Sequence, residues 1–354
     1  MTPPYSIQEV QQQLEPLPLP NAQFLADFLV ALITCQKVAL KKIANAMPGE
    51  AKPISQEQRI RRYLDLPRLC FGPAIADLLP LSAPWVLAMD RTNWKRGHTN
   101  INFLVLAVIA GNTAVPLLGR VLEHPGNRDT HERIALIQEF LARFGKHRLR
   151  LITADRDFIG ADWLRWLSQQ DIPFCLRIRC TDLLTHKNGT CARAQAATFF
   201  GRACRCRKLP FTLWNQLVFA AGKRLITGDW LIVVSNRQAD LRERYRLRWG
   251  IETLFQTLPK RGFDIETTCT TRTSALLGLL ALGYLWCLRA GLFLGATAPL
   301  KPLKHGRPAQ SWFRRGLDYL HRLLAPLSGG PHRANFDQAL LLLRPVPLPA
   351  KWCL

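Results

Sequence analysis

The sequence predicts an α/β fold, and three observations support this prediction. Three β-rich runs follow one another within residues 85–123, separated only by short polar or glycine-containing turns. Helical patterns at 129–145 and through 163–167 then alternate with short apolar strands at 149–154 and 173–179. Finally, 354 residues with 48% hydrophobic content suffice for two or three domains with a real core.

The N-terminal part, residues 1–82, is predicted to be a helical domain. Residues 21–45 are amphipathic with a basic end, and residues 55–64 carry several arginines. A turn containing glycine and proline at 47–53 separates them. Short basic helices of this kind suit a DNA-binding module. They suit equally a small helical bundle whose charges face water, so the sequence leaves both interpretations open.

The core follows in two parts. Three meandering strands, a helix, a strand, a helix and a strand are the order expected of a ribonuclease H-like domain, whose first part is 83–180. Residues 181–235 break this pattern with a turn-forming Asn-Gly pair, a basic cluster and short β-like runs, which predict a mostly β insertion. We expect residues 236–300 to complete the core, and residues 301–354 to form a basic, partly helical C-terminal region.

One helix in the second part of the core carries a notable acidic residue. Apolar residues recur at steps of three and four from residue 245 to 258, and Pro259 marks the expected stop. Tyr245, Arg248 and Glu252 are three and four residues apart, so they share one helix face. An isolated Arg/Glu pair on a helix is usually a weak surface ion pair. Its meaning therefore depends on other acidic residues.

Two aspartates supply that context. Asp90 and Asp155 each stand at or just after the end of an apolar strand, where a sheet exposes its functional edge. If the strands are neighbours, Glu252 on a covering helix completes a cluster that repels itself unless cations neutralise it. Oxygen ligands select Mg²⁺ or Mn²⁺, and two such ions about 4 Å apart promote in-line phosphoryl displacement. Nearby Asp157 is interpreted as a solvated or capping group, because Asp155 is the first acid after the strand.

Charge and composition indicate the partner and the compartment. The net charge is +23, with basic residues throughout the chain, which favours a polyanionic partner. Nucleic acid is favoured over an anionic membrane or a ribosomal setting. No secretory signal is visible, so a cytoplasmic location is expected. The apolar run 275–296 is long enough for a marginal membrane span, but it contains Arg289, and a buried helix is the favoured interpretation.

The ten cysteines form no CxxC pairs and are interpreted as reduced thiols. A zinc site is conceivable around the insertion, but the spacings match no common zinc pattern; its ligands would come from Cys180, His186, Cys191, Cys204 and Cys206.

Three segments carry a family resemblance. AMDRTNWKRG, ITADRDFIG and YRLRWGIETLF resemble the three active-site motifs of DDE transposases of the insertion-sequence 4 family. The similarity runs from about residue 85 to the GRPAQSWFRRGLDYL region. It implies a ribonuclease H-like core with a β insertion before the glutamate. It also implies an enzyme that cuts double-stranded DNA at transposon ends and joins the 3′-hydroxyl to target DNA, using Mg²⁺ and a synaptic homodimer.

Matched position by position, the resemblance makes Asp90, Asp155 and Glu252 the catalytic metal ligands. It also implies that Tyr245 and Arg248 contact DNA phosphate near the cut, a role that the fixed fork of a guanidinium suits.

Further DNA contacts are expected on the same ground. Trp230 resembles the tryptophan that, in hairpin-forming members, opens the last strand of the insertion and stacks on a flipped base; an aromatic in a β run is otherwise usually core. Lys95, beside the first aspartate, contacts phosphate or faces solvent. The chain departs from the family pattern where a lysine is expected seven residues after the glutamate, since Pro259 stands there. Its neighbours Lys260 and Arg261 are candidate substitutes.

Three functions remain open on the sequence. The first is an active DDE transposase. The second is a domesticated or inactive relative that grips DNA without cutting it, motivated by Pro259. The third is a nuclease of the same fold that cuts without joining. No P-loop and no serine or cysteine nucleophile motif is present, which weakens NTPase and acyl-transfer functions.

Overall fold

The computed structural model describes the chain except for short gaps; the described residues are 7–67, 69–96, 99–122, 130–188, 190–200, 205–206, 210–238, 240–257, 263, 273–299, 309–324 and 333–344. Within them the fold is mixed α/β, as predicted.

The N-terminal region is helical, as expected. Its elements are α1 (Ile7–Leu14), α2 (Ala22–Cys35), α3 (Leu40–Ala46), α4 (Pro53–Leu64) and α5 (Gly72–Leu78). The expected helix at 21–45 is two helices, because Gln36 adopts the left-handed conformation (φ 52°) and caps α2 by donating its N–H to the carbonyl of Leu32. The chain bends by 105° between α2 and α3.

The first part of the core contains every strand and helix predicted for it. These are β1 (Trp85–Arg96), β2 (Thr99–Ala110), β3 (Thr113–Leu122), α6 (Thr130–Phe144), β4 (Leu149–Ala154), α7 (Ala161–Gln169) and β5 (Phe174–Ile178), with short 3-10 turns η1 (Lys146–Arg148) and η2 (Arg156–Phe158). The strand order is β3-β2-β1-β4-β5. β1, β4 and β5 are parallel, and β2 is antiparallel to both neighbours. This arrangement is consistent with a ribonuclease H-like core.

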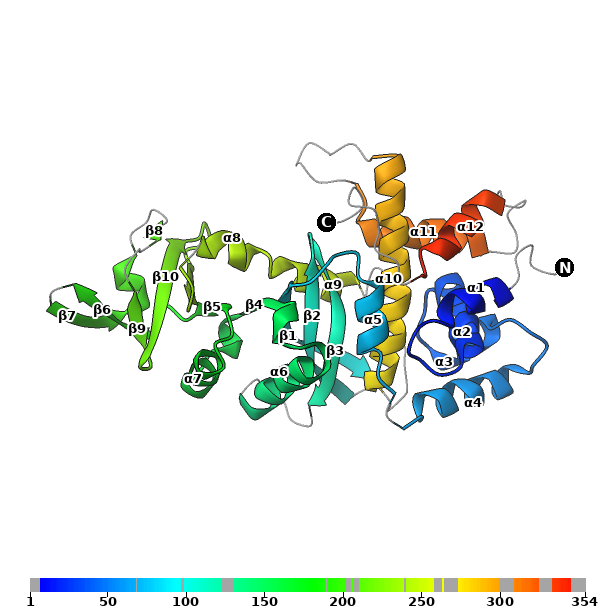
Figure 1. Cartoon of the computed structure of the whole chain (residues 1–354), viewed down its shortest axis with the longest axis horizontal. Helices are drawn as coiled ribbons and strands as arrows, with labels where there is room; N and C mark the ends of the chain where they lie inside the picture. The colour runs from blue at the N-terminus through cyan, green and yellow to red at the C-terminus, as the bar shows by residue number, and fades with distance from the viewer. Residues whose placement is uncertain are drawn as a thin grey trace.

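The region between the second aspartate and the glutamate is mostly β, and it continues the same sheet. It contains β6 (Leu183–Asn188), β7 (Thr190–Gln195), η3 (Ala196–Phe199), β8 (Arg205–Cys206), β9 (Phe211–Leu213), β10 (Gln216–Arg224) and β11 (Trp230–Ser235). β11 pairs antiparallel with β5, so the order runs on as β5-β11-β10-β9-β6-β7, and β8 pairs with β10. The described residues thus form one eleven-stranded sheet, whose β6–β7 hairpin lies at the end of the elongated molecule opposite the N-terminal helices (Figure 1).

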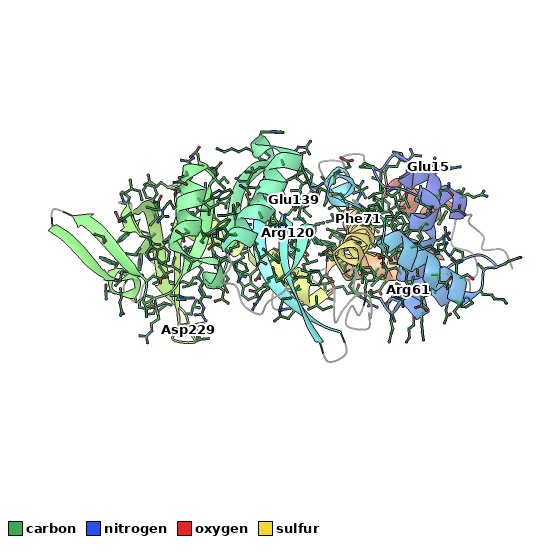
Figure 2. The ribbon with its side chains drawn as sticks, turned by 90° about the horizontal axis from the view of Figure 1, so that it is seen from below. Glu15, Arg61, Phe71, Arg120, Glu139 and Asp229 are labelled. Carbon is green, nitrogen blue, oxygen red and sulfur yellow. The ribbon has the colours of Figure 1, made fainter. Side chains whose placement is uncertain are left out.

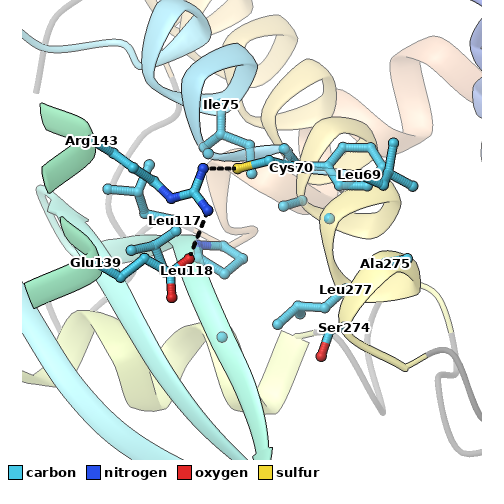
Figure 3. A pocket seen from close by; sticks show the side chains of 16 residues that line it. Leu69, Cys70, Ile75, Leu117, Leu118, Glu139, Arg143, Ser274, Ala275 and Leu277 are labelled. Atoms are coloured by element: carbon cyan, nitrogen blue, oxygen red, sulfur yellow. Dashed lines mark hydrogen bonds and ion pairs between the residues drawn. The ribbon is translucent and has the colours of Figure 1, made fainter. Parts of the chain in front are cut away.

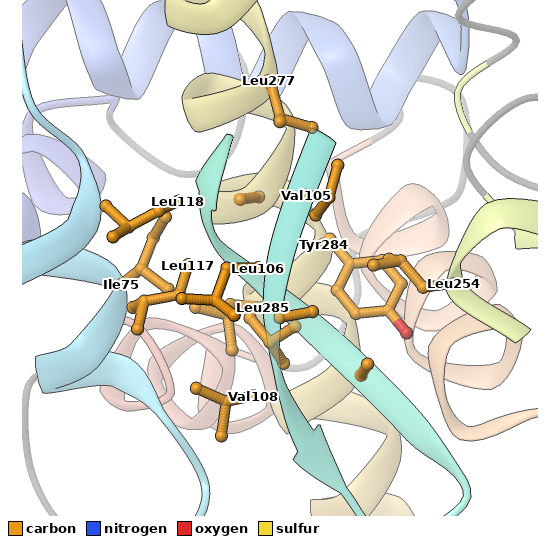
Figure 4. Close-up of a cluster of buried hydrophobic side chains, with 14 of the residues drawn as sticks. Ile75, Val105, Leu106, Val108, Leu117, Leu118, Leu254, Leu277, Tyr284 and Leu285 are labelled. Carbon is orange, nitrogen blue, oxygen red and sulfur yellow. The ribbon is translucent and has the colours of Figure 1, made fainter. Parts of the chain in front are cut away.

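The remaining elements are helices: α8 (Leu241–Arg246), α9 (Trp249–Gln256), α10 (Thr273–Thr297), α11 (Trp312–Leu324) and α12 (Arg333–Leu341). The single helix expected over 245–258 is therefore two, with a turn at Leu247 and Arg248. α10 packs against β3 on one side and against α2 and α11 on another. In Figure 4 its residues Leu277, Tyr284 and Leu285 lie among apolar side chains of β2 and β3.

The long apolar helix α10 is buried in the protein. Among the described residues, 274–297 is long and apolar enough to cross a membrane, and α2 with α3 passes the same test if the bent pair counts as one span. The most apolar window of 274–297 is 94% buried inside the protein. This burial agrees with the interpretation of 275–296 as a core helix.

The first and the last described helices meet in space. α11 contacts α2, and α12 contacts α1. The carbonyl of Ile33 in α2 lies 3.2 Å from Nδ1 of His321 in α11. Figure 2 shows Glu15 and Arg61 at this helical end, the Arg120–Glu139 pair near the middle, where an ion pair of 2.8 Å joins β3 to α6, and Asp229 in the β-rich part.

Candidate active site

The register of the parallel strands places the two aspartates side by side. Ala88 pairs with Thr153 and Met89 with Ala154, so Asp90 and Asp155 are the next residues on adjacent strands. Because alternate residues of a strand point to the same face, both carboxylates stand on the face of Ala88 and Thr153. Asp155 directly follows β4, as predicted, but Asp90 does not end its strand, because β1 continues to Arg96 in its pairing with β2. The parallel pairing of β1 with β4 does end at Met89 and Ala154, so both aspartates lie at the carboxyl edge of the parallel part of the sheet.

The same row continues onto β5 with a basic residue. Ala154 pairs with Leu176, so Asp155 stands beside Arg177. The Nη1 atom of Arg177 lies 3.7 Å from Oδ1 of Asp155, and its Nη2 donates to the carbonyl of Trp230 at 3.2 Å. Arg177 therefore links the second aspartate to the residue that begins β11.

Glu252 reaches this edge on α9, whose position depends on two local features. The side chain of Asn236 accepts from the N–H of Phe174 at 3.1 Å and donates to the carbonyl of Ile172 at 2.9 Å, which ties the end of β11 to the start of β5. Further along, a Cβ atom on Gly250 would lie only 2.5 Å from the carbonyl oxygen of Thr113. Glycine at this position thus allows α9 to approach the β2–β3 turn closely.

Arg248 stands between the first aspartate and the glutamate. Its Nη2 lies 2.6 Å from Oε1 of Glu252, and its Nη1 lies 3.6 Å from Oδ2 of Asp90. Its guanidinium also stacks over the ring of Tyr245, 5.3 Å from the centroid. Only 6% of the Arg248 side chain is exposed, whereas Asp90, Asp155 and Glu252 are 19%, 29% and 33% exposed. The arginine is thus enclosed while solvent still reaches each carboxylate.

Asp155 is held from three sides. Its Oδ1 accepts from the backbone N–H of Arg156 at 2.7 Å and from the hydroxyl of Tyr245 at 3.2 Å, in addition to the contact with Arg177. Burial raises the pKa of Tyr245, so its hydroxyl keeps the proton that it donates. The tyrosine on α8 thereby fixes the orientation of a carboxylate on β4.

The electrostatics show that the three acids interact. Burial raises the pKa of Asp90 to about 6, opposed by the N–H of Arg91 and the charge of Arg248, and supported by the negative charges of Asp155 and Glu252. Burial works against the charged form of Arg248, but Tyr245 and the carboxylates outweigh it and raise the pKa of the guanidinium. Arg248 is therefore a permanent cation inside an acidic cluster.

The structure thus gathers the three predicted acids around Arg248, with Tyr245 and Arg248 on the same side as Glu252, as the helical spacing indicated. Tyr245 and Arg248 are buried against carboxylates in this structure. Their contact with DNA stays a prediction.

The other predicted DNA contacts are less defined. Trp230 is half-buried, begins β11 and packs partly against the core. Lys95 lies in β1 opposite Asn100, and its side chain is outside the described part of the structure. Pro259, Lys260 and Arg261 lie outside the described residues altogether. Their roles stay predictions.

Sequence reasoning missed Arg177 at this edge and the exposure of Trp249 beside Arg248. Arg177 interrupts the apolar strand FCLRI, and a charge inside a short buried strand is the signal that could have identified it. Trp249 follows Arg248 directly and is 59% exposed, which is unusual for so large an apolar side chain. Its exposure could not be inferred while residues 245–258 were expected to form one continuous helix.

The side chains at this edge offer ligands that suit a metal ion. All three acids offer carboxylate oxygens, which Mg²⁺ and Mn²⁺ prefer. The space between Asp90 and Glu252 already holds a cation, the guanidinium of Arg248, so it suits positive charge. Within the described residues, however, no group of three or more His, Cys, Asp or Glu side chains is placed to hold one metal ion. The oxygen ligands and the charge of the site thus suit a metal ion, but in this structure Arg248 contacts two of the three carboxylates, Asp90 and Glu252.

The conceivable zinc site cannot be assembled from what is described. Cys180 is exposed. The side chains of His186, Cys191, Cys204 and Cys206 lie outside the described part of the structure.

A cavity of about 450 Å³ lies apart from the carboxylates, between α5, β3, α6 and α10 (Figure 3). Its lining is mostly apolar, with Arg143 donating to Sγ of Cys70 at 2.9 Å and contacting Glu139 at 3.2 Å. None of Asp90, Asp155 and Glu252 lines it. The candidate catalytic residues therefore lie at the acidic edge of the sheet and not in this cavity.

Comparisons with known proteins identify the family. No curated protein sequence matches the chain significantly. Among solved structures, it is similar to a piggyBac transposase in a synaptic complex with hairpin DNA, with 12% sequence identity and a TM-score of 0.46 over 93% of this chain and 78% of that chain. The family described as the transposase DDE domain matches residues 81–286, more than half of the 354 residues. The chain therefore belongs to the transposase DDE domain family.

Proposed function

We propose that this chain is a transposase that binds transposon-end DNA, cleaves it by metal-dependent hydrolysis and transfers the 3′-hydroxyl ends into target DNA. The observation that carries this proposal is the acidic edge of the sheet. Asp90 and Asp155 are adjacent on parallel strands, and Glu252 faces them from α9 across one buried guanidinium. Membership of the DDE family supports it.

Asp90, Asp155 and Glu252 are the residues that would hold Mg²⁺ or Mn²⁺, with two ions as the expected number. When bound, such ions activate water or a 3′-hydroxyl and stabilise the leaving oxygen of an in-line displacement. The chain's own contribution is positioning. Tyr245, Arg177 and the N–H of Arg156 orient the carboxylate of Asp155.

DNA is the proposed partner because of the charge of the chain. Its net charge of +23 favours a phosphate backbone. Arg156, next to Asp155, is exposed, and so is Arg242 on α8, the helix that carries Tyr245. We place Trp230, Lys95 and Lys260 among the DNA contacts on the ground of the family resemblance. The N-terminal helices are proposed as a second DNA-binding region.

The finer assignments rest on the three sequence motifs. We assign the chain to the insertion-sequence 4 family of DDE transposases, acting as a homodimer in the synaptic complex. A cytoplasmic, DNA-associated location without membrane contact follows from the proposed substrate. Base stacking by Trp230 applies if the cut proceeds through a hairpin.

A second candidate is a domesticated or inactive relative that binds the same DNA but does not cut it. The observation that favours it is Pro259, which stands where the family pattern has a lysine. This candidate retains the basic surface and the fold and lacks only the chemistry.

The test uses duplex DNA from the two ends of the element that carries this reading frame. The purified protein is incubated with Mn²⁺ or Mg²⁺, these duplexes and a supercoiled target plasmid. We expect end cleavage and target-joined product, both lost in Asp90→Asn and Asp155→Asn. Binding without cleavage would establish the second candidate. Cleavage without joined product would identify a nuclease of the same fold.

A further inference from the structure

We infer that Arg248 is an internal counterion that keeps the metal affinity of the free protein low until a DNA phosphate takes over its guanidinium. This inference rests on the proposed function, because it concerns how the same carboxylates become available to metal. It assigns to one residue the coupling of DNA binding to metal loading.

Arg248 is enclosed between two carboxylates. Arg248 has its Nη2 at 2.6 Å from Glu252 and its Nη1 at 3.6 Å from Asp90, and its side chain is only 6% exposed. A guanidinium in this position is not accessible to DNA, although the family resemblance implies a phosphate contact for it. The two roles need two positions of the same side chain.

The positive charge of Arg248 neutralises the carboxylates that a metal ion would bind. Carboxylates that face one another repel unless a cation lies between them, and in this structure Arg248 is that cation. A divalent ion on the same oxygens would have to displace the 2.6 Å contact with Glu252, and a guanidinium left nearby would repel it. The arginine and the metal therefore compete for the same carboxylates.

The position of Arg248 allows its guanidinium to exchange the carboxylates for a DNA phosphate. Arg248 stands at the turn between α8 and α9, and its neighbours Leu247 and Trp249 are 37% and 59% exposed, so this turn lies at the surface. Within the described residues, the Nε atom of Arg248 is buried without a hydrogen-bond partner, so the carboxylates do not use its full donor set. A phosphate offers a fork-shaped guanidinium two oxygens at once. DNA at this turn thus provides the alternative anion that releases Glu252 and Asp90.

A reciprocal linkage follows. If DNA draws Arg248 away from the carboxylates, DNA raises metal affinity, and by thermodynamic necessity metal raises DNA affinity by the same factor. Couplings of this kind typically amount to roughly 5–150-fold. Such a device keeps the nuclease chemistry dormant on protein that has not engaged DNA.

The experiment measures Mn²⁺ binding by electron paramagnetic resonance on the full chain without DNA. We expect Arg248→Gln to bind Mn²⁺ roughly tenfold more tightly than wild type, within the usual range of coupling. Arg248→Lys, which keeps a cation that reaches one carboxylate, should lie between them and guards against a misfolded glutamine variant. Arg246→Gln is the matched control, because Arg246 is 75% exposed and contacts Glu243 instead of the site. It should bind Mn²⁺ like wild type.

The second arm adds a precut transposon-end duplex, with the DNA-only signal subtracted. Wild type should gain roughly tenfold in Mn²⁺ affinity, whereas Arg248→Gln should change little. If Arg248→Gln binds Mn²⁺ no more tightly than wild type without DNA, or if Arg246→Gln shows the same gain, the inference is wrong. If the double variant Asp90→Asn, Asp155→Asn binds Mn²⁺ as wild type does with DNA, the metal site of the proposed function is wrong instead.

Discussion

Arg248 and Arg289 are both almost completely buried, and they are bound in opposite ways. Arg289, in the middle of α10, donates from Nη1 to the carbonyl of Leu78 at 2.8 Å and from Nη2 to the carbonyl of Arg344 at 3.1 Å. Arg248 instead contacts two carboxylates, Glu252 and Asp90, which solvent still reaches. One arginine is anchored to the backbone, whereas the other binds side chains that a different cation can also bind.

The groups that bind each arginine determine whether another ligand can compete for them. Backbone carbonyls at element ends have no competing ligand, so Arg289 joins α10 to the end of α5 and to the segment after α12. Ionised side chains at the edge of a sheet have competing ligands in metals and phosphates. Burial of a charge alone does not distinguish these cases, but the chemistry of the partners does.

The largest effect is expected from Arg289→Met, which removes the charge while keeping similar volume. It leaves the carbonyls of Leu78 and Arg344 without their charged donor, the first of them in a buried contact, so the free energy of unfolding should fall by about 3 kcal/mol. Urea unfolding followed by circular dichroism measures this. The control is Arg61→Met on α4, which is 50% exposed and should change stability by less than about 0.5 kcal/mol. An Arg289→Met protein as stable as wild type would show that the bonds of Arg289 to the backbone do not stabilise the fold.

Arg177→Gln tests an arginine of intermediate kind, which contacts both a carboxylate and a backbone carbonyl. Because it orients Asp155, we expect end cleavage at saturating Mn²⁺ to fall by about 10–100-fold, the usual effect of losing a partner of a metal ligand. The fold should stay intact by circular dichroism. Arg179→Gln, at an exposed position just beyond β5, should cleave like wild type. Equal cleavage by both variants would show that Arg177 does not position Asp155.

A pH titration tests whether burial, supported by the neighbouring acids, raises the pKa of Asp90. Its pKa is raised from 3.8 to about 6 in the folded protein, so folding favours its protonated form. This contribution to stability is full below about pH 4 and is lost as the pH rises through about 6. In metal-free protein, the wild type should therefore lose on the order of 2 kcal/mol relative to Asp90→Asn over this window. Parallel stability curves for the two proteins would contradict the raised pKa.

The smallest effect is expected from Gly250→Ala, which tests how closely α9, the helix that carries Glu252, packs against the β2–β3 turn. The added Cβ meets the carbonyl of Thr113 at 2.5 Å, so α9 must shift. We expect a loss of about 1 kcal/mol in unfolding free energy, at the low end of overpacking effects. Gly160→Ala meets no atom within 4 Å and serves as the control. Equal urea midpoints would show that α9 accommodates the methyl group.

Much of the core could be predicted from the sequence because its signals are local. Apolar runs such as LITA and WVLAM identify strands by themselves, and an aspartate follows each run in the sequence. Asp155 does follow the end of its strand, whereas β1 continues beyond Asp90 to Arg96. Their adjacency depended only on β1 and β4 being neighbours, which the register confirms. The amphipathic pattern of 129–145 likewise predicted α6 almost to the residue.

The remainder depends on contacts that no local pattern encodes. The turn at Leu247 and Arg248 interrupts a helix whose apolar spacing is regular, and Gln36 ends α2 within a segment that reads as one amphipathic helix. Arg177 lies beside Asp155 only because β5 follows β4 in the sheet. That Arg248 faces carboxylates, not solvent, is a property of the assembled edge and not of the helix that carries it.

The most direct test of the central claim, that Asp90, Asp155 and Glu252 hold one metal centre, is local cleavage of the polypeptide by bound iron. Fe²⁺ replaces Mg²⁺ in the complex with precut transposon-end DNA, ascorbate and peroxide are added, and mass spectrometry locates the cuts. We expect cuts next to residues 90, 155 and 252 in the wild type and their loss in Asp155→Asn. Cuts confined to other segments, or an unchanged pattern in Asp155→Asn, would contradict it.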